Sequence, residues 1–133
     1  MFKREIEYVD FNGVERKEDF YFHLSLPEVT RIEAEAGETL KDHIQQLVTN
    51  NKVKELLDFL EDVILTSYGE KTTDGRSFRK NKELREEFEN SPAYAEFFEQ
   101  LITEEGLAEK FGEKVADNGK SKKNTVAPTI VQD

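Results

Sequence analysis

Two stretches in which polar and apolar residues alternate flank an Asn-Gly pair near the N-terminus. They constrain the fold more than any other feature of the chain. Most of their apolar residues are even-numbered: Phe2, Ile6 and Tyr8 in the first stretch, and Phe20, Phe22, Leu24 and Leu26 in the second. Because side chains of a strand alternate between its faces, each stretch predicts a β-strand with one apolar face. The pair predicts a hairpin that packs its Phe-rich face on helices, since one hairpin alone is marginal.

The shared parity also predicts the register of the hairpin. Cross-strand partners must have residue numbers with an even sum if both apolar faces are to lie on the same side. A two-residue turn at Asn12-Gly13 would pair residue 11 with residue 14 and place the apolar residues on opposite faces. We therefore expect a loop with an odd number of residues, or a bulge.

After residue 26 the apolar residues follow the helical period instead. The segments 26–37, 39–48, 53–69, 81–102 and 104–115 predict about five helices, the fourth being restarted at Ser91-Pro92. Gly37 and Gly69 stand where helix-ending glycines are expected, and Thr39 has the spacing of an N-cap. The predicted fold class is therefore α+β, with one N-terminal hairpin packed on a mostly helical body.

The length of 133 residues indicates one domain, which we place at residues 1–116. Residues 117–133 are polar and aperiodic, which predicts a flexible tail that folding does not require. The alternative is that Val126, Ile130 and Val131 dock on the body. The charged N-terminus is not a signal peptide, and no apolar run is long enough to span a membrane. With no cysteine in the chain, we expect a cytoplasmic protein.

The net charge of −10 argues against nucleic-acid binding, which depends on Lys and Arg neutralising phosphates. An acidic balance suits a soluble protein, including one with a basic or aggregation-prone partner. His23 and His43 are the only histidines, one expected on the polar face of a strand and the other at a core edge. Neither has ligand-spaced neighbours, and no catalytic motif is present. We therefore expect no enzyme activity, no metal and no cofactor.

The segment 67–81, SYGEKTTDGRSFRKN, has two glycines and a basic cluster. It follows a predicted helix and lacks the spacing of a nucleotide-phosphate loop. We interpret it as a connector in which Asp74-Gly75 turns the chain and Arg79 and Lys80 can pair with the acidic helix that follows them.

The segment 92–102 carries the densest apolar stripe. Its members Tyr94, Phe97, Phe98 and Leu101, with Ile102, recur at helical spacing. Most of the 14 Phe and Tyr side chains must lie in the core. Any surplus would mark a partner-binding or self-association face. We single out Tyr94, Phe97, Phe98 and Leu101 as candidate partner-binding residues.

Residues 60–101 resemble the tail assembly chaperones of long-tailed phages that infect Gram-positive hosts. The resemblance is carried by an ordered set of elements: Tyr68-Gly69, Asp74-Gly75, Phe78, Lys80, Phe88, Ala93-Tyr94 and Phe97-Phe98. The strand Phe20–Leu24 is similar too, so the match spans about residues 1–112, whereas the tail from Asp117 departs from the pattern. On this reading Tyr68 and Phe78 anchor a structural joint between two helical parts.

The resemblance implies a non-enzymatic function. Such a chaperone binds the long, helical tape measure protein in the host cytoplasm, keeps it soluble and helps recruit tail-tube subunits. It is absent from the finished virion. Chaperones of this kind are often made in two lengths through a reading-frame slip, and Lys122-Lys123-Asn124 could be encoded by the run of A that such a slip needs. Two alternatives stay open: a structural or completion protein retained in the virion, and a regulator of a host protein.

Overall fold

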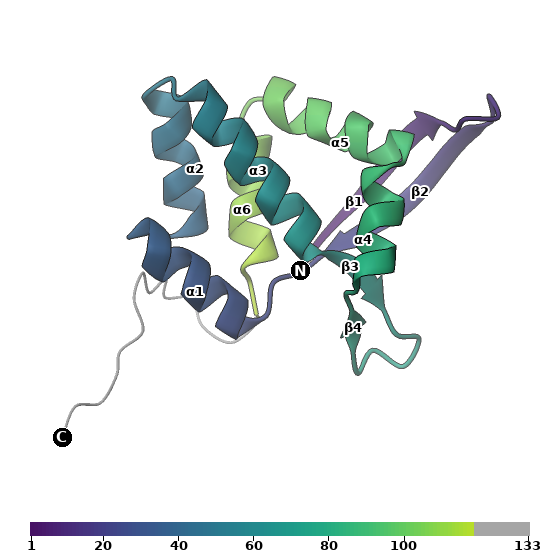
Figure 1. Cartoon of the computed structure of the whole chain (residues 1–133), viewed down its shortest axis with the longest axis horizontal. Helices are drawn as coiled ribbons and strands as arrows, with labels where there is room; N and C mark the ends of the chain where they lie inside the picture. The colour runs from purple at the N-terminus through teal and green to yellow at the C-terminus, as the bar shows by residue number, and fades with distance from the viewer. Residues whose placement is uncertain (119–133) are drawn as a thin grey trace.

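The computed structural model describes residues 1–118 and has an α+β fold, as predicted (Figure 1). Its strands form one antiparallel sheet in the order β1-β2-β3-β4. The strands are β1 (Phe2–Val9), β2 (Glu15–Phe22), β3 (Tyr68–Lys71) and β4 (Phe78–Arg79). The helices are α1 (Leu26–Ala36), α2 (Leu40–Thr49), α3 (Val53–Ser67), α4 (Lys82–Glu89), α5 (Pro92–Thr103) and α6 (Leu107–Val115).

The N-terminal hairpin has the register that parity predicts. Phe2 pairs with Phe22 and Ile6 with Glu18, so every pair of residue numbers sums to 24. The intervening loop, Asp10–Val14, has five residues, an odd number as expected. The hairpin forms an arm whose tip extends beyond the helices (Figure 1).

The expectation of a single hairpin is wrong, because residues 68–79 form a second hairpin and extend the sheet to four strands. Helix α3 ends at Ser67, and Tyr68 is already extended, so Gly69 is a strand residue and not a helix-ending glycine. A Cβ at Gly69 would lie 2.7 Å from the Phe78 ring and would also meet the carbonyl oxygen of Arg79. A glycine is therefore needed here so that the chain at β4 can lie close against β3.

Phe22 occupies the centre of the core, where the sheet meets the helices. Its ring is fully buried and stacks on Phe97 of α5, with 4.9 Å between the ring centroids. It also lies against the rings of Phe2, Phe88 and Phe111, at centroid distances of 5.7 to 6.3 Å. Side chains from β1, α4, α5 and α6 thus converge on the ring of Phe22 in β2, which joins the hairpin to the helical body.

Most of the predicted helix boundaries are confirmed. Gly37 ends α1 with a φ of 79°, and Thr39 caps α2 by accepting a hydrogen bond from the Asp42 amide. Ser91 caps α5, and Pro92 is its first residue, so residues 81–102 form two helices. The described residues therefore contain six helices where about five were expected.

The two ends of the described chain lie side by side. The Met1 amino group donates hydrogen bonds to the carbonyl oxygens of Lys114 and Asp117, at 3.1 and 3.0 Å. Burial lowers the pKa of this amino group. The predicted slip site at residues 122–124 and most of the predicted tail lie outside the described residues, so the division at residue 116 stays a prediction.

We predict that Phe22→Ala lowers the free energy of unfolding by about 3–5 kcal/mol, because it removes a buried ring contacted from several elements. Phe11→Ala is the matched control, since Phe11 is 84% exposed, and it should change stability by less than about 0.5 kcal/mol. Urea denaturation followed by circular dichroism measures both. If both variants lost the same free energy of unfolding, the central place of Phe22 in the core would be contradicted.

We predict that Gly69→Ala lowers the free energy of unfolding by about 1–3 kcal/mol, because the added methyl group forces β4 away from β3. The exposed Thr73→Ala in the same hairpin should have little effect. Thermal unfolding compares the two variants. A Gly69→Ala protein as stable as the wild type would show that β3 and β4 can separate without cost.

Candidate protein-binding surfaces

The four candidate partner-binding residues of α5 do not lie on one surface. Phe97 is fully buried against Phe22 and Phe2, and Leu101 is 3% exposed. Both face the sheet, so neither can contact a partner while the chain is folded. Tyr94 and Phe98 are only half-buried, at a centroid distance of 6.0 Å. Of the four, these two are left accessible.

Tyr94 and Phe98 continue along α5 to Ile102, which is 48% exposed, at the i, i+4 spacing of one helix face. Helix α3 runs in the opposite direction along the same side of the molecule (Figure 1). The Tyr94 hydroxyl donates to the Glu61 carboxylate at 3.3 Å and ties the two helices together.

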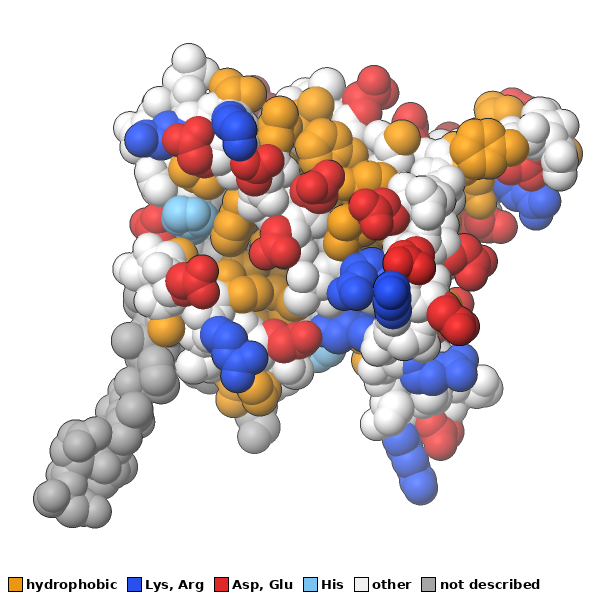
Figure 2. All heavy atoms as spheres, in the orientation of Figure 1, with side chains coloured by type: hydrophobic (Ala, Val, Ile, Leu, Met, Phe, Trp, Pro, Cys, Tyr) orange, Lys and Arg blue, Asp and Glu red, His pale blue; other side chains and the backbone are white. Residues whose placement is uncertain are grey.

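Two apolar residues of α3, Val53 and Leu57, share the helix face of Glu61. Val53 is 55% exposed and Leu57 is half-buried. Apolar side chains gather over these two helices in the space-filling view (Figure 2). We call the set Val53, Leu57, Tyr94, Phe98 and Ile102 the α3–α5 patch.

Acidic side chains lie among the apolar ones on this face of the molecule (Figure 2). The two helices carry six acidic side chains, namely Glu55, Asp58, Glu61, Asp62, Glu96 and Glu99. The only basic residue of the two is Lys54, so their net charge is −5, and Lys54 is already paired with Asp58 at 2.8 Å. Burial and the neighbouring charge of Glu61 raise the pKa of Tyr94 to about 12.

The acidic side chains continue into a cleft at the α4 end of α3. The cleft has a volume of about 450 Å³ and is lined by Asp58, Glu61, Asp62, Leu65, Thr66 and Arg85. Arg85 is its only basic lining residue. An apolar stripe with an acidic border is suited to an apolar segment that carries positive charge beside it.

The tip of the N-terminal arm is a second exposed apolar surface, which sequence reasoning missed. Phe11 is 84% exposed, with Val9 and Val14 about half exposed on either side. The loop is held by Asp10, whose carboxylate accepts the amides of Asn12 and Val14 at 2.8 and 2.9 Å and also the Arg16 side chain. The signal in the sequence was Phe11 itself, an odd-numbered aromatic residue inside a polar turn.

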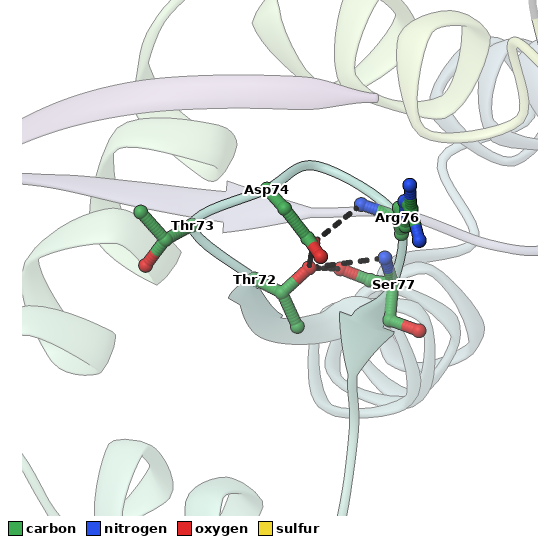
Figure 3. A pocket seen from close by; sticks show the side chains of 5 residues that line it. All are labelled: Thr72, Thr73, Asp74, Arg76 and Ser77. Atoms are coloured by element: carbon green, nitrogen blue, oxygen red, sulfur yellow. Dashed lines mark hydrogen bonds between the residues drawn. The ribbon is translucent and has the colours of Figure 1, made fainter.

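Within the segment 67–81, the turn at residues 72–77 bonds several of its own polar groups to one another. In the turn between β3 and β4, the Asp74 carboxylate accepts the Thr72 hydroxyl at 2.7 Å and the Arg76 amide at 3.0 Å (Figure 3). The Thr72 hydroxyl oxygen in turn accepts the Ser77 amide. The hollow of about 350 Å³ inside this turn thus has a carboxylate in its lining, which would repel a phosphate.

The remaining residues of the family pattern in this region contact other elements of the fold. Tyr68 stacks on Phe88 with 4.2 Å between the centroids, while Phe78 packs edge-on against His23. The Lys80 ammonium group donates to the His23 carbonyl oxygen at 3.0 Å and pairs with Glu28 at the start of α1. The second hairpin thus joins α3 and α4 and is fastened to α1.

The two histidines lie in different surroundings. His43 lies 2.8 Å from the Glu38 carboxylate and packs edge-on against Phe59. His23 follows β2 and is partly buried, not solvent-facing as expected, and burial lowers its pKa. Within residues 1–118, no group of three His, Cys, Asp or Glu side chains could hold a metal ion.

None of the helices in the described part of the chain is both long and apolar enough to cross a membrane. A family model described as phage tail assembly chaperone matches residues 1–116. The chain therefore belongs to the phage tail assembly chaperones, a family of chaperones and not an enzyme class. No curated protein and no solved structure matches the chain.

We predict opposite outcomes for a glutamate at two neighbouring positions of α5. Phe97→Glu should unfold the protein, because it buries an unpaired charge in the aromatic core. Phe98→Glu should stay folded, because this side chain reaches solvent at the α3–α5 patch. Circular dichroism and gel filtration of the two purified variants measure this. Unfolding of both would mean that the whole stripe is core.

Proposed function

We propose that this chaperone binds the tape measure protein of its phage in the host cytoplasm and keeps it soluble until the tail is built. It also helps to recruit tail-tube subunits, and it leaves before the virion is complete. Family membership supports the coarse function, and the α3–α5 patch is the observation that supports a binding role. No catalytic step is part of this proposal.

The α3–α5 patch offers the client an apolar surface that is already formed. A client helix that lays its apolar face on Val53, Phe98 and Ile102 removes that face from water, and the apolar contact stabilises the complex. The carboxylates around the patch favour a client segment with flanking Lys or Arg side chains. The strong negative charge of the chaperone also keeps the complex soluble by repulsion between complexes.

The arm tip suits a second contact, which we assign to the tail-tube subunit. Phe11 is held by a loop whose polar groups are bonded to one another, so little conformational entropy is lost when a partner covers the ring. The tip lies at the end of the arm, away from the α3–α5 patch (Figure 1). One chaperone molecule could therefore hold its client and a tube subunit together.

Co-expression with the tape measure protein tests the proposal. The wild-type chaperone should keep most of the tape measure protein in the soluble fraction, whereas Phe98→Glu combined with Ile102→Glu should leave it aggregated. Leu26→Glu is the matched control, because Leu26 is 54% exposed at the start of α1, outside the patch. Equal solubility with all three chaperones would show that the patch does not bind the client.

The alternative, a structural protein retained in the virion, makes a different prediction for purified particles. Mass spectrometry should find no peptide of this chain in mature virions if it is a chaperone that departs. Peptides present in stoichiometric amounts would support the structural alternative.

A further inference from the structure

We propose that residues 120–131 of this chain bind the α3–α5 patch when no client is present, so that the tail competes with the client. This inference rests on the proposed function, because it concerns regulation of the same surface. It commits to one occupant, the C-terminal segment of the same molecule.

Charge is the first argument. Beyond Asn118 the sequence contains Lys120, Lys122, Lys123 and one acidic residue, Asp133, so that residues 119–133 carry +2 of side-chain charge. Since the whole chain carries −10, residues 1–118 carry −12. The tail is therefore a positive segment attached to a strongly negative body. Helices α3 and α5, at −5 with one already paired lysine, present such negative charge next to exposed apolar side chains.

The order of residues in the tail is the second argument. The lysines are followed by Val126, Ile130 and Val131, with Pro128 between them. Proline interrupts helices and favours extended backbone. An extended segment can lay its apolar side chains on the stripe while the lysines reach the carboxylates beside it. The tail thus combines the two properties that the patch requires of an occupant.

The tail is also long enough. Helix α6 begins just after α5, and its nine residues rise about 13 Å before the chain reaches Val115. The eight residues from 119 to 126 can extend over about 26 Å. This reach is about twice the rise of α6, so the segment can pass back along that helix towards the end of α5.

The arm tip is a poorer acceptor for the tail. It is apolar, but Arg16 and Lys17 stand among the acidic residues of the arm, and the Asp10 carboxylate is occupied by Arg16. A lysine-rich segment gains less there than on α3 and α5. Charge complementarity therefore selects the α3–α5 patch.

An occupant tethered in this way binds reversibly. Short flexible tethers give effective concentrations of about a millimolar, so even weak contacts keep the patch covered for much of the time. A client must displace the tail. The apparent association constant for the client is therefore the intrinsic constant multiplied by the fraction of molecules whose patch is uncovered. Salt should release the tail, since its lysines are screened at high ionic strength.

The experiment uses the full-length chain throughout. Amide spectra of ¹⁵N-labelled wild type are compared with those of the triple variant Lys120→Glu, Lys122→Glu, Lys123→Glu. We expect the amides of Leu57, Phe98 and Ile102 to shift between the two proteins at low salt, and the difference to shrink at 1 M NaCl. A synthetic peptide of residues 119–133, added to the triple variant, should move the same amides back towards their wild-type positions.

The matched control reverses three exposed lysines of the body, Lys17, Lys71 and Lys82, and so changes the net charge by the same amount. Its spectrum should leave the patch amides at their wild-type positions. Patch amides that do not respond to the triple variant, or that respond equally to the control, would overturn the proposal.

Client affinity separates this inference from the proposed function. If both hold, the tape measure protein should bind the triple variant about two- to tenfold more tightly than the wild type at low salt. Patch shifts without any client binding would uphold the tail contact and reject the client. Client binding that the triple variant leaves unchanged, with no patch shifts, would reject the tail contact alone.

Discussion

The stacking of Phe22 on Phe97 is the contact on which the rest of the structure depends. It joins the last residue of β2 to a helix residue 75 positions later in the chain, and Phe2, Phe88 and Phe111 close around it. A two-stranded arm has no core of its own, so its base must be supported by the helices. Once the base is buried in this way, the tip can extend into solvent and remain ordered.

Some features could be predicted from the sequence because a single physical rule decides them. The even parity of Phe2, Ile6, Phe20 and Phe22 allowed only registers with an even sum, and the loop length followed from it. The second hairpin could not be predicted, because β3 and β4 have only four and two residues and show no alternation. A glycine at position 69 fits the end of a helix and a close approach between two strands equally well, so its role is undecided until the position of β4 is known.

The division of α5 into core and surface was equally hidden. An aromatic stripe as wide as that of α5 covers more than one face of the helix, so spacing alone cannot tell Phe97 from Phe98. The distinction comes from the sheet, which covers one side of α5, and from α3, which leaves the other side partly open. The negative charge of this surface, in contrast, was visible in the composition. What the sequence did not show is that Glu61 of α3 lies beside Tyr94 of α5, joined to it by a hydrogen bond.

The self-contained loop at the arm tip has a consequence for how this protein can change. Asp10 bonds the loop to itself, and Phe11 takes no part in those bonds. The identity of residue 11 is thus almost uncoupled from the stability of the fold. A lineage can exchange this side chain for another and meet a different surface without having to repair anything beneath it. If the tip contacts a partner as proposed, the arm separates the residue that makes this contact from the residues that keep the chain folded.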